Sequence, residues 1–348
     1  MVPKKYLVSI IWGYSKRMYD FAIEENYHLH VLNIAKELGY VPVVIIKQEK
    51  GCIENDPKFD KNIKIINYKN LFNYFFQIFK YSFKNSIFYV NSVEPQSLCV
   101  PFLAKNTIFM GHTRPERQTW LKQKIFNFSM SFFSKIRLNN NKEKEFLLKQ
   151  KIKNKKLKVI PLALSLKDYR ILDNDNKRKD LVYFGNITHI KNLPTIIMAC
   201  NLVCKKYPDI KLHIIGEECD EIDDNLISNK LKVIKHGFKK PSEANAMLNK
   251  FLICLNSSFN EGMCVSVYNA TLSGCALCLP KIMSFVGVFK DKALFHEVND
   301  YKKLAKNIIF YLNNHEIIEK HNRSCRDIIL EKYNHEIISK KLKELLII

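Results

Sequence analysis

Short apolar runs alternate with stretches of helical periodicity along the first half of the chain. Residues 6–12, 41–46 and 87–90 form apolar runs rich in β-branched and aromatic side chains, which is the pattern of parallel strands covered on both faces. Residues 28–38 space their apolar positions as an amphipathic helix does, and Gly39 supplies a stop signal. Because no Asn-Gly hairpin signal separates these elements, the pattern predicts a parallel α/β sheet.

The alternation restarts after a polar segment near the middle of the chain. Residues 167–180 contain few apolar side chains and many turn formers, so they mark a domain boundary. We predict an N-terminal domain over residues 1–165 and a second domain over residues 166–325, two similar α/β halves with a cleft between them. Residues 326–348 are predicted to form a C-terminal helix that packs back on the first domain.

The charge of the chain is strongly positive and unevenly distributed. Its 348 residues include 56 Lys and Arg against 34 Asp and Glu, a net charge of +22. Residues 1–165 hold 28 of the basic and 12 of the acidic residues, so most of the excess lies in the N-terminal half. This asymmetry predicts an anionic partner there: a membrane surface, a nucleic acid or a phosphorylated substrate.

The ten cysteines are not spaced as a disulfide or zinc framework. Most lie in apolar stretches, and Cys275 and Cys278, although at redox spacing, fall in a predicted buried strand. We therefore expect free, buried, reduced thiols in a cytosolic protein. No apolar stretch reaches the ~18–20 residues of a membrane-spanning helix. The run at residues 6–12 is short and lacks a cleavage site, so it is predicted to be a strand and the protein to be cytoplasmic.

Two glycines end predicted strands in the second half, at the kind of position where open parallel sheets bind ligands. Gly185 lets the chain turn sharply after its strand, and Lys191 follows six residues later. Lys191 can hold a phosphate as a point charge, although a surface lysine ahead of a helix would look the same. Gly216 ends the next strand in a similar way.

The most specific junction is Asn260-Glu261-Gly262, which follows an apolar strand and opens a helix near Cys264. Backbone N–H groups at residues 263–265 can bind a phosphate or sugar oxygen, and Glu261 can accept hydrogen bonds from sugar hydroxyls. The alternative is that Glu261 only interacts favourably with the positive end of the helix dipole. An Asn-Glu-Gly turn ahead of an apolar helix, beyond the end of a strand, favours ligand binding.

These residues resemble the nucleotide-sugar-binding domain of GT-B glycosyltransferases, specifically retaining family 4 (glycosyltransferase group 1). Residues 181–216 are similar to the family's strand–loop–helix–strand block, residues 235–238 to its base-contacting segment, and residues 261–274 to its glutamate–seven–glutamate motif. The resemblance covers roughly residues 160–325 and is topological in the first half. It implies two Rossmann-like parallel-sheet domains facing each other across a cleft, and transfer with retention that needs no divalent metal.

The resemblance also implies roles for particular residues. Lys191 stands at the family's phosphate-binding lysine and Glu261 at the glutamate that meets the donor sugar. Asn186 replaces the family's arginine, and Asn269 replaces the second glutamate, which binds ribose; the motif is thus degenerate. The implied donor-binding residues are Gly185, Asn186, Gly216, His236, Gly237, Phe238, Gly262, Met263, Cys264, Val265 and Asn269.

The first half is expected to bind the acceptor. The strand at residues 107–110 runs into Gly111-His112, which resembles the family's histidine near the donor sugar, so His112 joins Lys191 and Glu261 as a catalytic candidate. Arg114 and Arg117 can bind the acceptor or supply the cation that Asn186 lacks.

Two stretches interleave aromatic and basic residues, at residues 68–89 and 119–138. Such stretches suit a bilayer interface, where apolar side chains enter and lysines meet anionic headgroups; the alternative is that the aromatics belong to the core. Together with the charge of the N-terminal half, they predict peripheral docking on the inner face of the membrane.

We therefore predict a retaining, nucleotide-sugar-dependent hexosyltransferase with a lipid-linked, lipopolysaccharide or other envelope glycan acceptor, and with no cofactor or metal. The alternatives are a non-catalytic GT-B homologue or a basic protein that binds an anionic surface or nucleic acid. Nucleic acid is not expected, because the chain has no helix-turn-helix, RNP-type motif or zinc finger. A related epimerase would need more carboxylates in the cleft.

Overall fold

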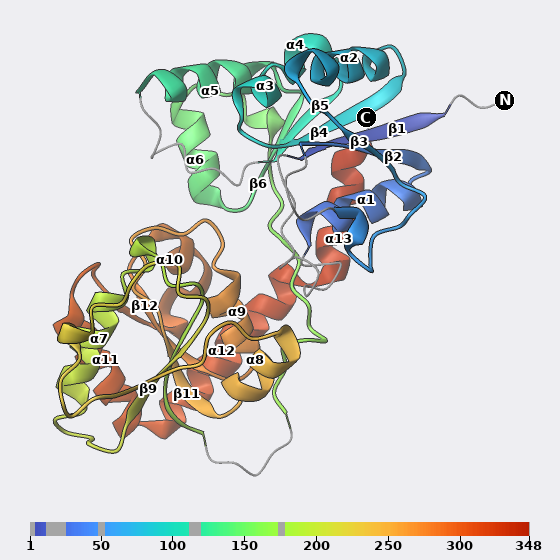
Figure 1. The fold of residues 1–348 in the computed structure, drawn as a ribbon. Coiled ribbons are helices and arrows are strands. Elements are labelled where there is room, and N and C mark those ends of the chain that lie inside the picture. The colour runs from blue at the N-terminus through green and yellow to red at the C-terminus, as the bar shows by residue number, and fades with distance from the viewer. Residues whose placement is uncertain (1–3, 12–25, 48–52, 111–119, 173–177, 348) are drawn as a thin grey trace. The chain divides into compact units, whose positions relative to one another are not determined.

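The computed structural model describes five stretches of the chain, which form two compact units (Figure 1). Unit 1 comprises residues up to Ala163 together with His335–Ile348, and unit 2 comprises Leu164–Asn334. Within these units the structure describes residues 4–11, 26–47, 53–110, 120–172 and 178–347.

Unit 1 is built on a parallel sheet with the strand order β3-β2-β1-β4-β5-β6-β7. The strands are β1 (Lys5–Ile11), β2 (Tyr40–Ile46), β3 (Lys64–Asn67), β4 (Asn85–Asn91), β5 (Thr107–Met110), β6 (Lys135–Leu138) and β7 (Leu157–Val159). The helices are α1 (Tyr27–Glu37), α2 (Leu71–Ser82), α3 (Pro95–Leu98), α4 (Val100–Leu103), α5 (Trp120–Phe132), α6 (Asn141–Lys149) and α13 (His335–Leu346), with short 3₁₀ turns at Ile53–Asn55 and Asn154–Lys156.

Alternate side chains of the central strands of unit 1 enter two separate cores. Leu7 and Ile11 of β1 pack with α1 and α13, whereas Val8 and Ile10 pack with α2, α5 and α6 on the other face. Helix α13, the last in the chain, lies beside α1 (Figure 1) and buries four apolar side chains in the first of these cores. They are Ile338, Leu342, Leu345 and Leu346.

A buried arginine holds the segment at which the chain leaves unit 1. Arg137 of β6 is 1% exposed, and its guanidinium donates to the carbonyl oxygens of Ile160 and Pro161, each at 2.8 Å, and to the hydroxyl of Tyr89 at 2.9 Å. Because two acceptors lie in the crossover segment and the third in β4, Arg137 ties the crossover segment to β4 and β6.

Unit 2 contains a second parallel sheet, with the order β10-β9-β8-β11-β12-β13. The strands are β8 (Lys179–Phe184), β9 (Lys211–Ile215), β10 (Lys232–Lys235), β11 (Phe251–Leu255), β12 (Ala276–Pro280) and β13 (Leu294–His296). The helices are α7 (Leu193–Val203), α8 (Pro241–Leu248), α9 (Val265–Leu272), α10 (Met283–Phe289), α11 (Tyr301–Asn313) and α12 (His315–Tyr333), with 3₁₀ turns at His189–Lys191, Asp224–Leu226 and Lys290–Lys292.

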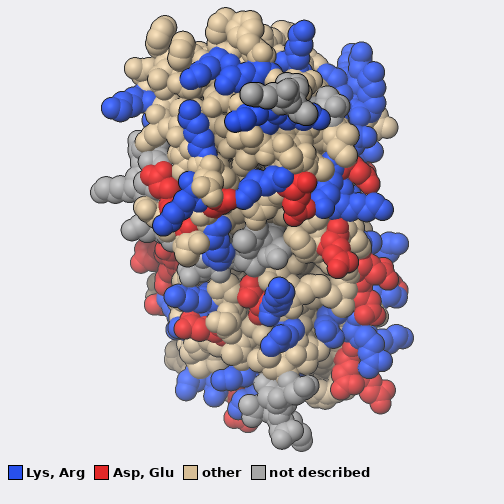
Figure 2. All heavy atoms as spheres, turned by 90° about the vertical axis from the view of Figure 1, so that its right-hand side faces the viewer, with Lys and Arg blue, Asp and Glu red and all other residues tan. Residues whose placement is uncertain are grey.

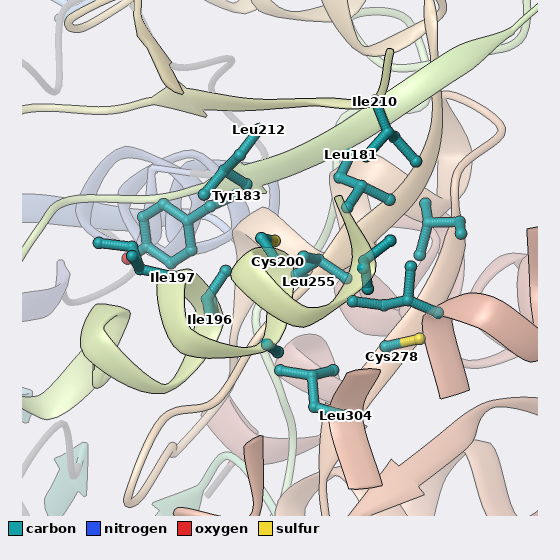
Figure 3. Packing of buried hydrophobic residues seen from close by; sticks show 14 of the residues in the cluster. Leu181, Tyr183, Ile196, Ile197, Cys200, Ile210, Leu212, Leu255, Cys278 and Leu304 are labelled. Carbon is teal, nitrogen blue, oxygen red and sulfur yellow. The ribbon is translucent and has the colours of Figure 1, made fainter. Parts of the chain in front are cut away.

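The sheet of unit 2 is covered on both faces, as its continuous apolar strands predict. Figure 3 shows the core in which Leu181 and Tyr183 of β8 meet side chains of α7 and α11. On the other face, Val182 of β8 packs with side chains of α8, α9, α10 and α12. The predicted fold class, two Rossmann-like parallel α/β domains, is therefore confirmed.

The nine cysteines in the described part of the chain are all free. Seven are buried as expected, but Cys99 and Cys219 are exposed, so the expectation of buried thiols is wrong for these two. Within the same residues, no helix combines the length and the apolar composition needed to cross a bilayer.

Candidate functional site

Neighbouring strands β8 and β11 form the point in unit 2 where the strand order reverses. After β8 the chain passes through α7 to β9 on one side, and after β11 it passes through α9 to β12 on the other. Because α7 and α9 cover opposite faces, the loops that follow β8 and β11 diverge and leave a crevice at the carboxyl edge of the sheet. Open parallel sheets bind ligands at such crevices.

The two strongest predicted residues of this domain meet at the crevice. Lys191 comes from the loop after β8 and Glu261 from the loop after β11, and Lys191 Nζ lies 2.5 Å from Glu261 Oε1. The same Oε1 accepts a hydrogen bond from Ser258 Oγ at 2.7 Å. The Glu261 side chain is 4% exposed and that of Lys191 20%, so this charged pair is largely desolvated and reachable from the lysine side.

Glycine is required where the loops after β8 and β9 touch. Gly216 has φ +152°, and a Cβ atom placed on it would lie 1.9 Å from the carbonyl oxygen of Gly185. The Gly216 N–H donates to the carbonyl of Gly237 at 3.0 Å. Three predicted donor-binding glycines thus lie in three adjacent loops, and bare backbone lines this part of the edge.

Helix α9 presents its N-terminus to the same loops. Cys264 stands at its N-cap and no side chain caps it, so the positive end of the helix dipole is available to an anion. Gly262 and Met263, in the loop ahead of it, and Val265, its first residue, are half-buried. A Cβ on Gly185 would lie 3.3 Å from Ser266 Oγ in the first turn of α9, so the helix start lies directly against the loop after β8.

The two asparagines that replace charged family residues have different environments. Asn269, in the second turn of α9, is 4% exposed and its Oδ1 has no hydrogen-bond partner. An unpaired buried acceptor is costly, and a hydroxyl donor from a ligand would satisfy it. Asn186 is exposed, and its carbonyl oxygen accepts a hydrogen bond from Tyr183 at 2.8 Å.

The predicted base-contacting segment follows β10. Phe238 is 42% exposed and offers an aromatic surface. His236 is half-buried, and its Nε2 lies 2.9 Å from Nδ1 of His213, whose ring is stacked on it at an interplanar angle of 6°. His213 Nε2 lies 3.5 Å from Asp180 Oδ2. Burial lowers the pKa of both imidazoles, which favours their neutral forms, and this hydrogen bond requires at least one of the two rings to be neutral.

Sequence reasoning missed His213 and Asp180, because both are inside strands and carry no motif. The contacts of His213 with Asp180 and with His236 depend on the register of β8, β9 and β10, which pairs Leu181 with Leu212. The only signal was a histidine in an otherwise apolar strand.

In unit 1 the predicted residues His112, Arg114 and Arg117 lie outside the residues that the structure describes, so their roles stay predictions. The strand order reverses between β1 and β4, and two polar residues that the sequence analysis did not select lie at the end of β4 and the start of α1. Asn91 and His28 are 9% and 3% exposed, and Asn91 Nδ2 lies 3.3 Å from His28 Nδ1. They are further candidates for the acceptor side.

Metal-ligating side chains do not cluster in the described stretches, where no group of three or more His, Cys, Asp or Glu residues could hold an ion. The absence of a metal requirement stays a prediction.

Two parallel α/β units are the architecture of two-domain glycosyltransferases. The chain belongs to the family of glycosyl transferases group 1, whose model matches residues 167–345. No curated protein matches the chain.

Solved structures with the same fold are distant in sequence. A glycosyltransferase from Rickettsia africae ESF-5 is 16% identical, with a TM-score of 0.77 and 100% of each chain covered. Anabaena Alr3699/HepE in complex with UDP-glucose is 12% identical, with a TM-score of 0.77 and 98% of this chain and 99% of that chain covered. Sucrose-phosphate synthase (tll1590) from Thermosynechococcus elongatus is 11% identical, with a TM-score of 0.76 and 98% of each chain covered. At these identities the likeness shows the fold.

Proposed function

We propose that this glycosyltransferase is a retaining, family 4 hexosyltransferase that uses a nucleotide-sugar donor and no metal. Its acceptor would be a lipid-linked, lipopolysaccharide or other envelope glycan at the inner face of the membrane. Family membership and the UDP-glucose bound to one protein of the same fold support a nucleotide-sugar donor. The basic first half of the chain supports an acceptor at an anionic surface.

The contact between Lys191 and Glu261 carries this proposal, because it joins a cation and a hydroxyl acceptor at the switch point of unit 2. In the donor complex, Lys191 and the N-terminus of α9 would hold the diphosphate, and Glu261 would accept hydrogen bonds from the sugar. As the bond between sugar and diphosphate breaks, negative charge grows on the diphosphate. The lysine and the helix dipole are then placed to stabilise it.

Asn186 and Asn269 would make weaker contacts with the donor than the charged residues that the family has at these positions. The unpaired Oδ1 of Asn269 can accept a hydrogen bond from a ribose hydroxyl, as the family's glutamate does. Asn186 supplies no charge, so a second cation on the diphosphate would come from Arg114 or Arg117. His112 would lie near the donor sugar.

A second candidate is a non-catalytic homologue that binds a nucleotide-sugar without transferring the sugar. The observation in its favour is the loss of charge at Asn186 and Asn269 together. Donor binding without release of nucleotide diphosphate would identify this candidate.

A thermal-shift screen against UDP-, GDP- and ADP-sugars tests donor binding. A ligand at 100 times its Kd stabilises the protein by about 2.7 kcal/mol, or roughly 5–10 °C for a unit of this size. Lys191→Met and Glu261→Gln should each remove most of the shift. Lys250→Met is the matched control, because Lys250 is exposed and directly precedes β11 at the opposite edge of the sheet.

The screen can reject the proposal directly. If no nucleotide-sugar raises the melting temperature, or if Lys191→Met and Glu261→Gln respond like Lys250→Met, the donor site is misplaced. With a donor identified, NMR of the product's anomeric proton reports whether the configuration is retained.

A further inference from the structure

Helix α2 is apolar on both sides, although it covers only one face of the sheet. Tyr74 and Ile78 enter the core beneath it, whereas Phe72, Phe76 and Phe79 on its outer side are 83%, 53% and 54% exposed. Large apolar side chains exposed on a surface helix usually mark a contact with protein or membrane. The described part of the chain leaves the outer side of α2 uncovered.

This exposed surface continues over two neighbouring helices. A groove of about 480 Å³ between α2 and α4 is lined by five phenylalanines, Phe102 of α4 among them, together with Cys99 and Leu103. Phe102 packs against Phe128 and Phe132 of α5, with ring centroids 6.0 and 4.7 Å apart. We call this surface the phenylalanine face; its exposed members are Leu71, Phe72, Phe76, Phe79, Phe83, Phe102, Leu103, Ile125, Phe128 and Phe132.

The phenylalanine face is larger than a soluble monomer normally exposes. Its seven phenylalanines are 46% to 83% exposed, and at about 200 Å² for each ring they present roughly 800 Å². The largest apolar patch of a typical monomer is about 300–600 Å², and larger ones mark protein or membrane contacts.

Charge distinguishes between the possible partners of this face. Residues 61–142, which contain α2, α4 and α5, include 13 Lys and Arg but only 2 Asp and Glu. Exposed lysines lie on or beside the same helices, at Lys69, Lys80, Lys84, Lys105 and Lys124. On the side of the molecule drawn in Figure 2, the top of unit 1 carries basic and uncharged side chains, and the acidic ones lie further down.

We propose that the phenylalanine face inserts into the outer acyl region of a bilayer that contains anionic phospholipid. Its rings would enter the hydrocarbon while the surrounding lysines meet headgroup phosphates. A second copy of the chain fits less well, because two such faces would bring their own lysines together. This inference deepens the proposed function and rests on it in one respect: the face would hold the enzyme where a lipid-linked acceptor lies.

Vesicle flotation of the full chain tests the face without donor or acceptor. We expect at least tenfold stronger partitioning into phosphatidylcholine vesicles containing 30% phosphatidylglycerol than into pure phosphatidylcholine, weakening as salt rises. Phe72→Ser/Phe128→Ser should lower partitioning into the anionic vesicles at least tenfold. Both side chains are mostly exposed, so the fold does not depend on them. Phe310→Ser is the matched control, because Phe310 is 45% exposed on α11 of unit 2 and should leave partitioning unchanged.

Several outcomes would overturn the proposal. They are no flotation with anionic vesicles at 50 mM salt, equal flotation of wild type and Phe72→Ser/Phe128→Ser, or a wild-type dimer that the double variant converts to a monomer. The donor-induced thermal shift, measured on the same variants, keeps the two hypotheses apart. If Phe72→Ser/Phe128→Ser loses flotation but keeps the donor-induced thermal shift, the result supports the phenylalanine face independently of the donor site. If the wild type floats but shows no thermal shift with any donor, the result rejects only the donor site.

Discussion

The contact between Lys191 and Glu261 should contribute about 2 kcal/mol of coupling free energy to the stability of unit 2. Nζ and Oε1 lie 2.5 Å apart, with 20% of the lysine and 4% of the glutamate side chain exposed. Exposed ion pairs couple by about 0.2–1 kcal/mol, whereas removing one partner of a fully buried pair costs about 3–5 kcal/mol. The intermediate burial of this pair places its coupling between these limits.

A double-mutant cycle measures this coupling without any ligand. The free energy of unfolding is obtained from urea titrations of wild type, Lys191→Met, Glu261→Gln and the double variant. Each single variant should lose about 2–3 kcal/mol, because it removes the opposite charge beside a largely desolvated side chain. The double variant should then lose about 2 kcal/mol less than the sum of the two.

The pair Lys281–Glu297 provides the matched control in the same unit. Its atoms lie 3.0 Å apart, but the side chains are 61% and 67% exposed, so its coupling should stay below about 0.5 kcal/mol. A coupling between Lys191 and Glu261 no larger than that of the control would refute the reasoning. The two side chains would then not share a desolvated crevice, and one ligand could not engage both.

Two further predictions concern unit 2. His296 is 1% exposed and burial lowers its pKa to about 4. The unfolded chain then takes up a proton near pH 6.5 while the folded one does not, so stability is full above pH 7 and falls by about 2 kcal/mol at pH 5. His296→Gln should reduce this fall in urea midpoints compared at pH 7 and 5, and an unchanged fall would exclude His296 as its source. Gly216→Ala should lower the free energy of unfolding by about 3 kcal/mol, because the added Cβ would lie 1.9 Å from the Gly185 carbonyl oxygen. The same variant should lose the donor-induced rise in melting temperature. Gly287→Ala, in open space within α10, should raise stability by about 0.5–1 kcal/mol, so equal melting temperatures would contradict the packing of these loops.

The parts of the fold that depend on local pattern could be predicted from the sequence. The apolar runs at residues 6–12 and 41–46 correspond to β1 and β2, and residues 28–38 to α1. Lys191 and Glu261 could be placed at the same edge of the sheet, because the loops that follow parallel strands all leave from the carboxyl edge. That expectation needed only the order of elements, which the alternation of runs supplies.

Other features depend on three-dimensional placement that no local pattern specifies. The contact of His213 with His236 and Asp180 arises from strand register. Half of the twelve residues of α2 are aromatic and they lie on both of its sides, so its periodicity could not separate buried Tyr74 from exposed Phe72. The composition of residues 68–89 predicted a membrane partner. The structure identifies which of their side chains are exposed and can contact that partner.

The position of α13 has a consequence for how the protein is made. This helix completes one core of unit 1, yet it follows the whole of unit 2 in the chain. At a synthesis rate of about 5–20 residues per second, α13 is synthesised roughly 10–40 s after the rest of unit 1. During this time the α1 side of the first sheet is not fully covered. Residues 164–334 are continuous and can fold in that interval. The nascent chain therefore completes its second unit before its first, and its unfinished first unit is a natural client for chaperones.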